Sequence, residues 1–139
     1  MRTIFCLLLF CGFVSSKNNS QHNFLIEEVK EDSIPVLNFD NVKNELIRRN
    51  IPCWEIVLAQ SQHESGNYTS RICKKKNNIF GMKGKNGYKK YSSWVECIDD
   101  YEQRFSKRYK GGDYFEFLIK VHYHEDPNYE MLVKKFIKK

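Results

Sequence analysis

Glu64 is the side chain whose place in the sequence most strongly indicates chemistry. It lies seven residues after Val57 and three after Ser61, on the inward stripe of a predicted helix that must end before Gly66. A carboxylate on such a face is costly unless it is paired, hydrogen-bonded or placed in a cleft where a raised pKa is useful. A frayed helix end that turns Glu64 toward water fits the periodicity equally well. Glu64 is therefore a candidate acid, with this alternative open.

Other catalytic and metal-binding patterns are missing from the sequence. It contains no Gly-x-Ser-x-Gly elbow of a serine hydrolase, and no cysteine carries the local signature of a thiol protease. It also lacks Cys-x-x-Cys and His-x-x-x-His pairs, so we expect no metal site and no cofactor. Lys74, Lys75 and Lys76 are the main sign of nucleic-acid binding, and a solvated surface explains such a run without a partner. We therefore expect no nucleic-acid ligand.

Hydrophobic periodicity predicts the helices that would hold Glu64. Residues 38–50 repeat apolar side chains at helical spacing, and Asn38 or Asp40 could cap the helix. Pro52 then suits the first turn of a second helix. That helix carries Glu64 near its C-terminal end.

A small two-stranded lobe is predicted to follow the second helix. The basic run at residues 71–76 leads into two short segments that carry aromatic residues. Between these segments stand Asn86 and Gly87, which both tolerate the positive φ of a tight hairpin turn. The sequence therefore predicts one β-hairpin here.

Three further helical segments are predicted after the hairpin. Ser93 and Glu96 have the spacing of a capping box, and the helix they begin extends to about Arg108. Asp113 can cap a short helix, and residues 126–127 have the Asp-Pro order that begins a final one. We expect four or five helices around one core, interrupted once by the hairpin.

Composition limits the chain to one small basic domain. Its 139 residues, 41% hydrophobic, suffice for a single core, and its net charge is +6. These values exclude repeat arrays, large multi-domain enzymes and global disorder. An exported protein with this charge would favour anionic partners such as cell-wall polymers, membrane surfaces or nucleic acid, although a solvated basic face is the simpler explanation. We expect a monomer.

The N-terminus has the pattern of a secretory signal peptide. A short positive start precedes an apolar run at residues 4–14 that is too short to span a bilayer comfortably. We therefore expect a signal peptide at residues 1–16, a polar tether at residues 17–34 and one domain at residues 35–139. Lipoprotein anchoring through Cys11 is disfavoured because Phe10 is bulkier than such a site allows. The exported chain would have no stable membrane insertion.

Cleavage at that point would leave an odd number of cysteines. Cys53, Cys73 and Cys97 allow at most one internal disulfide, so the chain is not a disulfide scaffold. Which two of them would pair stays open.

Four segments in order resemble the family-73 glycoside hydrolases. They are residues 58–66 (LAQSQHESG), 77–84 (NNIFGMKG), 91–101 (YSSWVECIDDY) and 123–129 (YHEDPNY). Members of that family are peptidoglycan β-N-acetylglucosaminidases. The resemblance implies an α+β, predominantly α fold: a lysozyme-like helical core with one small β-hairpin lobe.

The resemblance also implies roles for individual residues. Glu64 takes the place of the family's general acid, which protonates the glycosidic oxygen, and partial burial would raise its pKa as that role requires. Tyr123 matches the family's cleft tyrosine, which positions or stabilises the reacting sugar. The implied substrate-binding residues are Asn78, Phe80, Gly81, Tyr68 and Tyr91.

One departure from the family affects the mechanism. Members often carry a second carboxylate on the hairpin lobe, but residues 65–95 contain no Asp or Glu. Glu96 is assigned to the capping box, while Asp99 and Asp100 either approach the cleft or lie on a helix surface. We therefore expect the nucleophile to be the substrate's own N-acetyl group, or a water held near Tyr123.

The sequence thus predicts an exported peptidoglycan hydrolase of a bacterium, active in the periplasm or outside the cell, that cleaves the β-1,4 bond after N-acetylglucosamine. The missing hairpin carboxylate favours one alternative: a catalytically weak or inactive peptidoglycan-binding module of the same fold.

Overall fold

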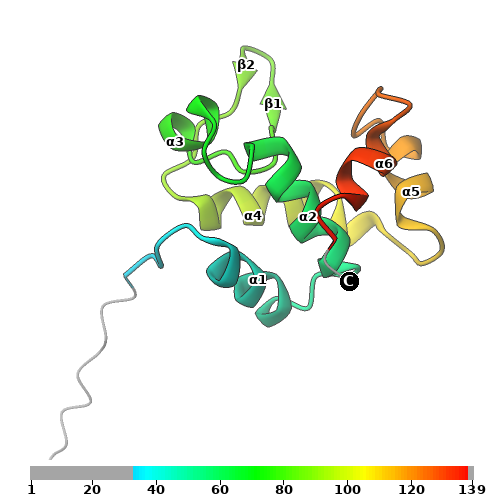
Figure 1. Ribbon diagram of the computed structural model, residues 1–139, viewed down its shortest axis with the longest axis horizontal. Coiled ribbons are helices and arrows are strands. Elements are labelled where there is room, and N and C mark those ends of the chain that lie inside the picture. The colour runs from blue at the N-terminus through cyan, green and yellow to red at the C-terminus, as the bar shows by residue number, and fades with distance from the viewer. Residues whose placement is uncertain (1–32, 138–139) are drawn as a thin grey trace, which may run out of the picture. The chain divides into compact units, whose positions relative to one another are not determined.

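The computed structural model describes residues 33–137, which form six α-helices, one short 3-10 helix and one two-stranded antiparallel sheet (Figure 1). The predicted class, predominantly helical with a single small hairpin, is confirmed. The predicted signal peptide and almost all of the predicted tether lie outside the described residues. Within the described part of the chain, no helix is both long and apolar enough to cross a membrane.

Local signals predicted the start of the first helix and the end of the second, whereas Pro52, expected in the first turn of the second helix, lies before its N-cap, Cys53. Helix α1 (Phe39–Arg48) is capped by Asn38, whose Oδ1 accepts a hydrogen bond from the Asn41 backbone N–H at 2.8 Å. Helix α2 (Trp54–Ser65) ends at Gly66, whose φ of 57° lies in the left-handed region that a helix C-cap often adopts. Helix α2 packs against both α1 and α6 and runs through the middle of the domain in Figure 1.

Helix α2 is buried on most of its sides, which explains why polar side chains occur inside it. Ser61 donates its hydroxyl to the Leu58 carbonyl at 2.7 Å, and Ser65 donates to the Ser61 carbonyl at 2.6 Å. These bonds satisfy groups that would otherwise be unpaired in the core. The helix is therefore a rigid, polar-lined support for residues near its C-terminal end.

The segment after α2 contains a helix that periodicity did not indicate. Helix α3 (Arg71–Lys76) is capped by Ser70, which accepts from the Cys73 backbone N–H at 3.2 Å. Only Cys73 of this helix is buried, and its last turn consists of lysines. Because one buried position defines no repeat, the sequence revealed only a basic run.

The hairpin forms where it was predicted, with its turn shifted by one residue. Strand β1 (Lys83–Gly84) pairs with β2 (Gly87–Tyr88), and Lys83 stands opposite Tyr88. Lys85 and Asn86 make the connection, and Gly87 has a φ of 95°. Asn86 keeps a negative φ, so only the glycine supplies the left-handed conformation that was expected of both residues.

Helix α4 (Trp94–Arg104) starts with a variant of the predicted capping box. Ser93 accepts from the Glu96 backbone N–H at 3.1 Å, but the Glu96 carboxylate accepts from the backbone N–H and the hydroxyl of Ser92 instead of Ser93. The helix ends at Arg104, earlier than predicted, because Phe105 leaves helical geometry and a 3-10 turn, η1 (Ser106–Arg108), follows.

The last two helices complete the core. Helix α5 (Tyr114–Lys120) is capped by Asp113 as predicted. Helix α6 (Tyr129–Lys134) begins later than predicted, because Asp126 uses its carboxylate to accept from the Asn128 backbone N–H in a turn. The three cysteines among the described residues are free thiols, and two of them are buried.

Candidate active site

Glu64 lies on the wall of a groove of about 570 Å³. Side chains from four parts of the fold line this groove: the end of α2, the hairpin and its entrance, the end of α4, and the loop that leads into α6. The lining residues are His63, Glu64, Phe80, Gly81, Met82, Lys83, Tyr88, Arg104, Phe105, His122, Tyr123, His124, Glu125, Asp126 and Tyr129.

The carboxyl group of Glu64 is held from two sides. Its Oε1 accepts a hydrogen bond from the Tyr129 hydroxyl at 2.8 Å. Its Oε2 lies beside Gly81, where an added Cβ would come within 2.8 Å of that oxygen. Helix α2 stays regular through Ser65, so the frayed-end alternative does not describe this side chain.

Burial raises the pKa of Glu64. Removal from water raises the pKa of this carboxyl, and the Tyr129 hydrogen bond and the charges of His63 and Lys83 partly oppose that rise. Glu64 takes part in none of the salt bridges formed by residues 33–137. A carboxyl in such surroundings can retain a proton for transfer.

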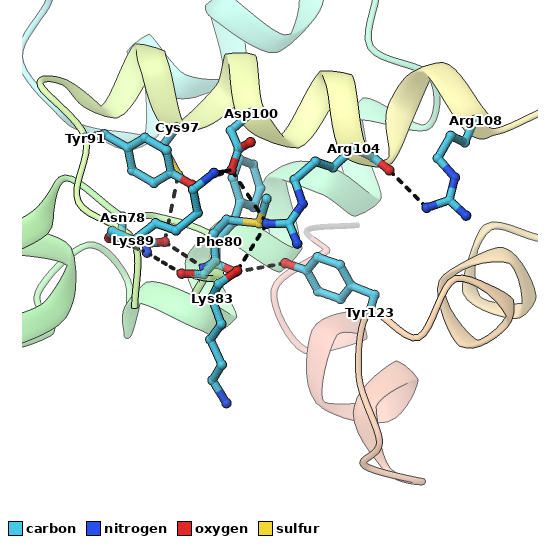
Figure 2. Close-up of polar contacts among 11 residues, drawn as sticks. Asn78, Phe80, Lys83, Lys89, Tyr91, Cys97, Asp100, Arg104, Arg108 and Tyr123 are labelled. Atoms are coloured by element: carbon cyan, nitrogen blue, oxygen red, sulfur yellow. Dashed lines mark hydrogen bonds and ion pairs between the residues drawn. The ribbon is translucent and has the colours of Figure 1, made fainter. Parts of the chain in front are cut away.

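Tyr123 reaches into the same groove from the loop before α6. Its hydroxyl donates to the Phe80 carbonyl at 3.0 Å, as Figure 2 shows. Its ring lies edge-on to Phe105, with the ring centroids 4.9 Å apart. Burial raises the pKa of Tyr123 well above its ordinary value, so the phenol stays protonated at neutral pH.

Phe80 and Gly81 form the part of the groove that enters the hairpin. The Phe80 ring stacks on Tyr101 with centroids 4.2 Å apart, so the ring packs in the core while the backbone borders the groove. Gly81 has a φ of 61°. Four of the seven predicted site residues, Glu64 among them, therefore meet at one groove.

The other three predicted site residues do not line the groove, because their polar groups are engaged inside the fold. Buried Asn78 donates to the carbonyls of Met82 and Lys89, each at 2.9 Å, and accepts from the Met82 N–H at 2.8 Å. These bonds fasten the hairpin entrance (Figure 2). The hydroxyl groups of Tyr91 and Tyr68 likewise form hydrogen bonds within the fold.

The Tyr91 hydroxyl donates to Asp100 at 2.6 Å, and the Tyr68 hydroxyl is bonded to Ser61 Oγ at 2.8 Å. Tyr91 and Tyr68 thus fasten one element of the fold to another. Neither tyrosine lines this groove, where substrate contact was predicted for both.

The chain was compared with known proteins. Residues 40–139 match the model of the glucosaminidase family, described as mannosyl-glycoprotein endo-beta-N-acetylglucosaminidase. The chain belongs to the glucosaminidase family. Membership implies a glycoside hydrolase that acts on glycans, and the resemblance noted in the sequence is confirmed. Searches of the curated proteins and of the solved structures each found no significant match.

In the glucosaminidase domain, the three acids that the sequence offered as possible partners of Glu64 have structural roles. Glu96 serves as a helix cap. Asp99 pairs with Arg49, and Asp100 accepts from Lys89 at 2.7 Å as well as from Tyr91. None of these three acids lines the groove.

Two other acids border the groove of the glucosaminidase domain. Glu125 and Asp126 lie in the loop before α6, and Asp126 Oδ1 accepts from the Asn128 backbone N–H at 2.8 Å. Among residues 33–137, no group of three or more His, Cys, Asp or Glu side chains could hold a metal ion.

Tyr129 is the main functional candidate that sequence reasoning missed. Its spacing placed it on the apolar face of the last helix, and its ring is indeed buried. The partner of its hydroxyl, Glu64, stands 65 residues earlier in the chain. The only sequence signal for Tyr129 was its place at the end of the family-like segment at residues 123–129. That segment does not indicate which residue the Tyr129 hydroxyl would contact.

Proposed function

We propose that this glucosaminidase cleaves the β-1,4 bond after N-acetylglucosamine in peptidoglycan, with Glu64 as the general acid. One observation carries the proposal: Glu64 stands on the groove wall with its pKa raised by burial and without a salt bridge among the described residues. A carboxyl group that burial keeps protonated to a higher pH than usual can protonate the glycosidic oxygen as the bond breaks.

The proposed reaction uses the substrate's own acetamido group. As Glu64 gives its proton to the leaving oxygen, the N-acetyl carbonyl oxygen attacks the anomeric carbon and the glycosidic bond breaks. Water then opens the cyclic intermediate, and the Glu64 carboxylate takes a proton from that water. The absence of acids from residues 65–95 favours this route, because the hairpin offers no second carboxylate. Tyr123, whose proton is committed to Phe80, still has lone pairs to accept a hydrogen bond from sugar or water.

We further propose that the protein acts after export, in the periplasm or outside a bacterial cell. The signal-like N-terminus supports export, and the net charge, +6 for the full sequence and +5 once Arg2 leaves with the signal peptide, favours attachment to anionic wall material. Peptidoglycan strands are then the available partner, and the enzyme needs no cofactor in this mechanism.

Digestion of purified sacculi tests the proposed function. The exported chain is incubated with sacculi, and the released fragments are identified by mass spectrometry. We expect fragments with N-acetylglucosamine at the reducing end. Fragments that end in the muramic sugar would contradict the bond assignment. Binding to sacculi without release of any fragment would instead support the binding-module alternative.

A further inference from the structure

A chain of buried hydrogen bonds leads from Glu64 into the core. The Tyr129 hydroxyl, bonded to Glu64 Oε1, accepts from the side-chain amide of Gln60 at 3.2 Å. The other end of the same amide, Gln60 Oε1, accepts from the Tyr101 hydroxyl at 2.7 Å. Tyr101 is in turn 3.0 Å from the hydroxyl of Tyr114. Gln60 and Tyr101 have no solvent exposure.

The donors and acceptors along this chain run in one direction. A tyrosine hydroxyl has one proton, while a glutamine amide donates only from nitrogen and accepts only at oxygen. Because Gln60 donates to the Tyr129 oxygen, the Tyr129 proton is available for Glu64. Because Tyr101 gives its proton to Gln60, Tyr114 must be the donor to Tyr101. Every proton therefore points toward Glu64 Oε1.

We propose that Gln60 and Tyr129 are positioning residues that keep Glu64 Oε1 a permanent hydrogen-bond acceptor and so place the catalytic proton on Oε2. This inference rests on the proposed function of Glu64 as an acid. Protonation of Oε1 would weaken the bond from Tyr129, because a carboxylic hydroxyl oxygen accepts a hydrogen bond less well than a carbonyl oxygen, so the acid's proton is favoured on the other oxygen. Oε2 is the oxygen beside Gly81, at the hairpin side of the groove.

The placement of the chain supports a role beyond packing. Fully buried polar groups are not needed to fill a core, since apolar side chains of similar volume pack without unpaired donors. Here the three buried polar residues that follow Tyr129 form a continuous series that ends at the only carboxyl group of α2 on the groove. A fixed rotamer and a fixed protonation site are what general acid catalysis requires of this carboxyl.

Other charged and titratable groups also face the groove around Glu64. They come from α2, the hairpin, α4 and the loop before α6: His63, Lys83, Tyr88, Arg104, His122, Tyr123, His124, Glu125 and Asp126. His63 and Lys83 lower the pKa of Glu64 by their charge. All of these groups are retained when Tyr129 is changed, so a difference between variants reports the Tyr129 hydrogen bond.

Direct titration of Glu64 in the full chain tests the proposal. Carbon-13 NMR of labelled glutamate carboxyl groups follows the titration, and the signal of Glu64 is the one that Glu64→Gln removes. Tyr129→Phe deletes a donor to the charged form, so we expect the midpoint to rise by about one pH unit. The alkaline limb of kcat/KM on peptidoglycan should move upward with it. A loss of packing alone would lower the rate and leave both midpoints in place.

The matched control is Tyr109→Phe. The Tyr109 hydroxyl donates to the Gly112 carbonyl at 2.5 Å, and this residue does not line the groove. The Glu64 midpoint should therefore stay where it is. If Tyr129→Phe leaves the midpoint unchanged, or moves it downward because Tyr129 accepts a proton from Glu64, the proposal is overturned.

A second variant keeps the proposal falsifiable should Tyr129→Phe fail to fold. Gln60→Met removes the amide that orients the Tyr129 hydroxyl at similar side-chain volume, and we expect a smaller upward shift of the same midpoint. An unchanged midpoint would overturn the role of Gln60. An inactive wild type that still shows the expected NMR shifts would refute the proposed function alone. An active enzyme without those shifts would refute the positioning role alone.

Discussion

Gly81 lies directly against the carboxyl group of Glu64: a Cβ built on Gly81 would be 2.8 Å from Glu64 Oε2 and 3.7 Å from its carboxyl carbon. The glycine belongs to the hairpin entrance and the glutamate to the end of α2, so the contact joins two elements that are separate in the chain. Close approach of a backbone to a reacting group is a position that only glycine can occupy without displacing its neighbour.

Replacement of this glycine should therefore damage catalysis more than folding. Gly81→Ala would add a methyl group that the Glu64 carboxyl must move to avoid, and misplacement of a catalytic group by about 1 Å can reduce rates by about 100-fold. The left-handed backbone adds a stability loss of about 1–2 kcal/mol. Initial rates on sacculi and chemical denaturation measure the two effects separately.

Gly87→Ala is the matched control for backbone strain. Gly87 also has a positive φ, but a Cβ there would meet no atom within 4 Å. We expect it to lose comparable stability and retain most of the activity. Equal losses of activity in the two variants would show that strain in the hairpin, and not contact with Glu64, is responsible.

Removal of the acid should slow hydrolysis strongly in a protein that still folds. Glu64→Gln has no proton to give, yet its amide oxygen can still accept from Tyr129, so we expect a rate loss of about 100-fold to 10,000-fold with the fold intact. Glu55→Gln, on the same helix but exposed and away from the groove, should retain full activity. Full activity in Glu64→Gln would remove this residue from the mechanism.

The same substitution should change how stability depends on pH. Burial raises the pKa of Glu64 above its ordinary value of 4.5, so the folded protein holds this proton more tightly than the unfolded chain. The resulting stabilisation is fully present below the unfolded pKa and is lost as the pH rises through the folded pKa. Glu64→Gln carries no such proton, so its melting temperature should improve relative to wild type as the pH rises from about 4.5 through the folded pKa of Glu64.

Much of the fold was predictable because its boundaries are set by local chemistry. Asn38, Ser93 and Asp113 cap helices through their own side chains, and Gly66 ends α2 through its backbone. Signals of this kind act over three or four residues and can be found in a sequence. Helix α3 escaped prediction because a single buried residue leaves no periodic pattern.

The candidate site was only partly predictable because its contacts join distant segments. Helical spacing placed Glu64 on an inward face, and the family-like segments identified Tyr123. The motif around Asn78 indicated a place in the groove, whereas the hydrogen bonds of its side chain hold the hairpin together. No local pattern distinguishes a polar side chain that faces substrate from one that is consumed by neighbouring backbone groups.

This structural role of Asn78 predicts a stability defect. Asn78→Ala leaves the buried N–H and C=O of Met82 and the carbonyl of Lys89 without their side-chain partner, which should lower the free energy of unfolding by about 2 kcal/mol or more. Thermal or urea denaturation measures this, with Asn86→Ala in the exposed turn as the control. A raised KM with unchanged stability would instead restore Asn78 to the substrate-binding set.

Salt should weaken attachment of the protein to the wall if its positive charge serves this purpose. The net charge of +5 that remains once Arg2 leaves with the signal peptide attracts anionic polymers over a screening length that falls from about 10 Å at 0.1 M salt to about 3 Å at 1 M. We expect sedimentation with sacculi to decline steeply over that range. The double variant Lys74→Gln and Lys75→Gln, which removes two exposed charges from α3, should bind less at low salt and converge with wild type at high salt. Because active enzyme would digest the sacculi during the assay, the same salt series is also measured with Glu64→Gln. Wall affinity that does not change with salt would rule out attachment by charge.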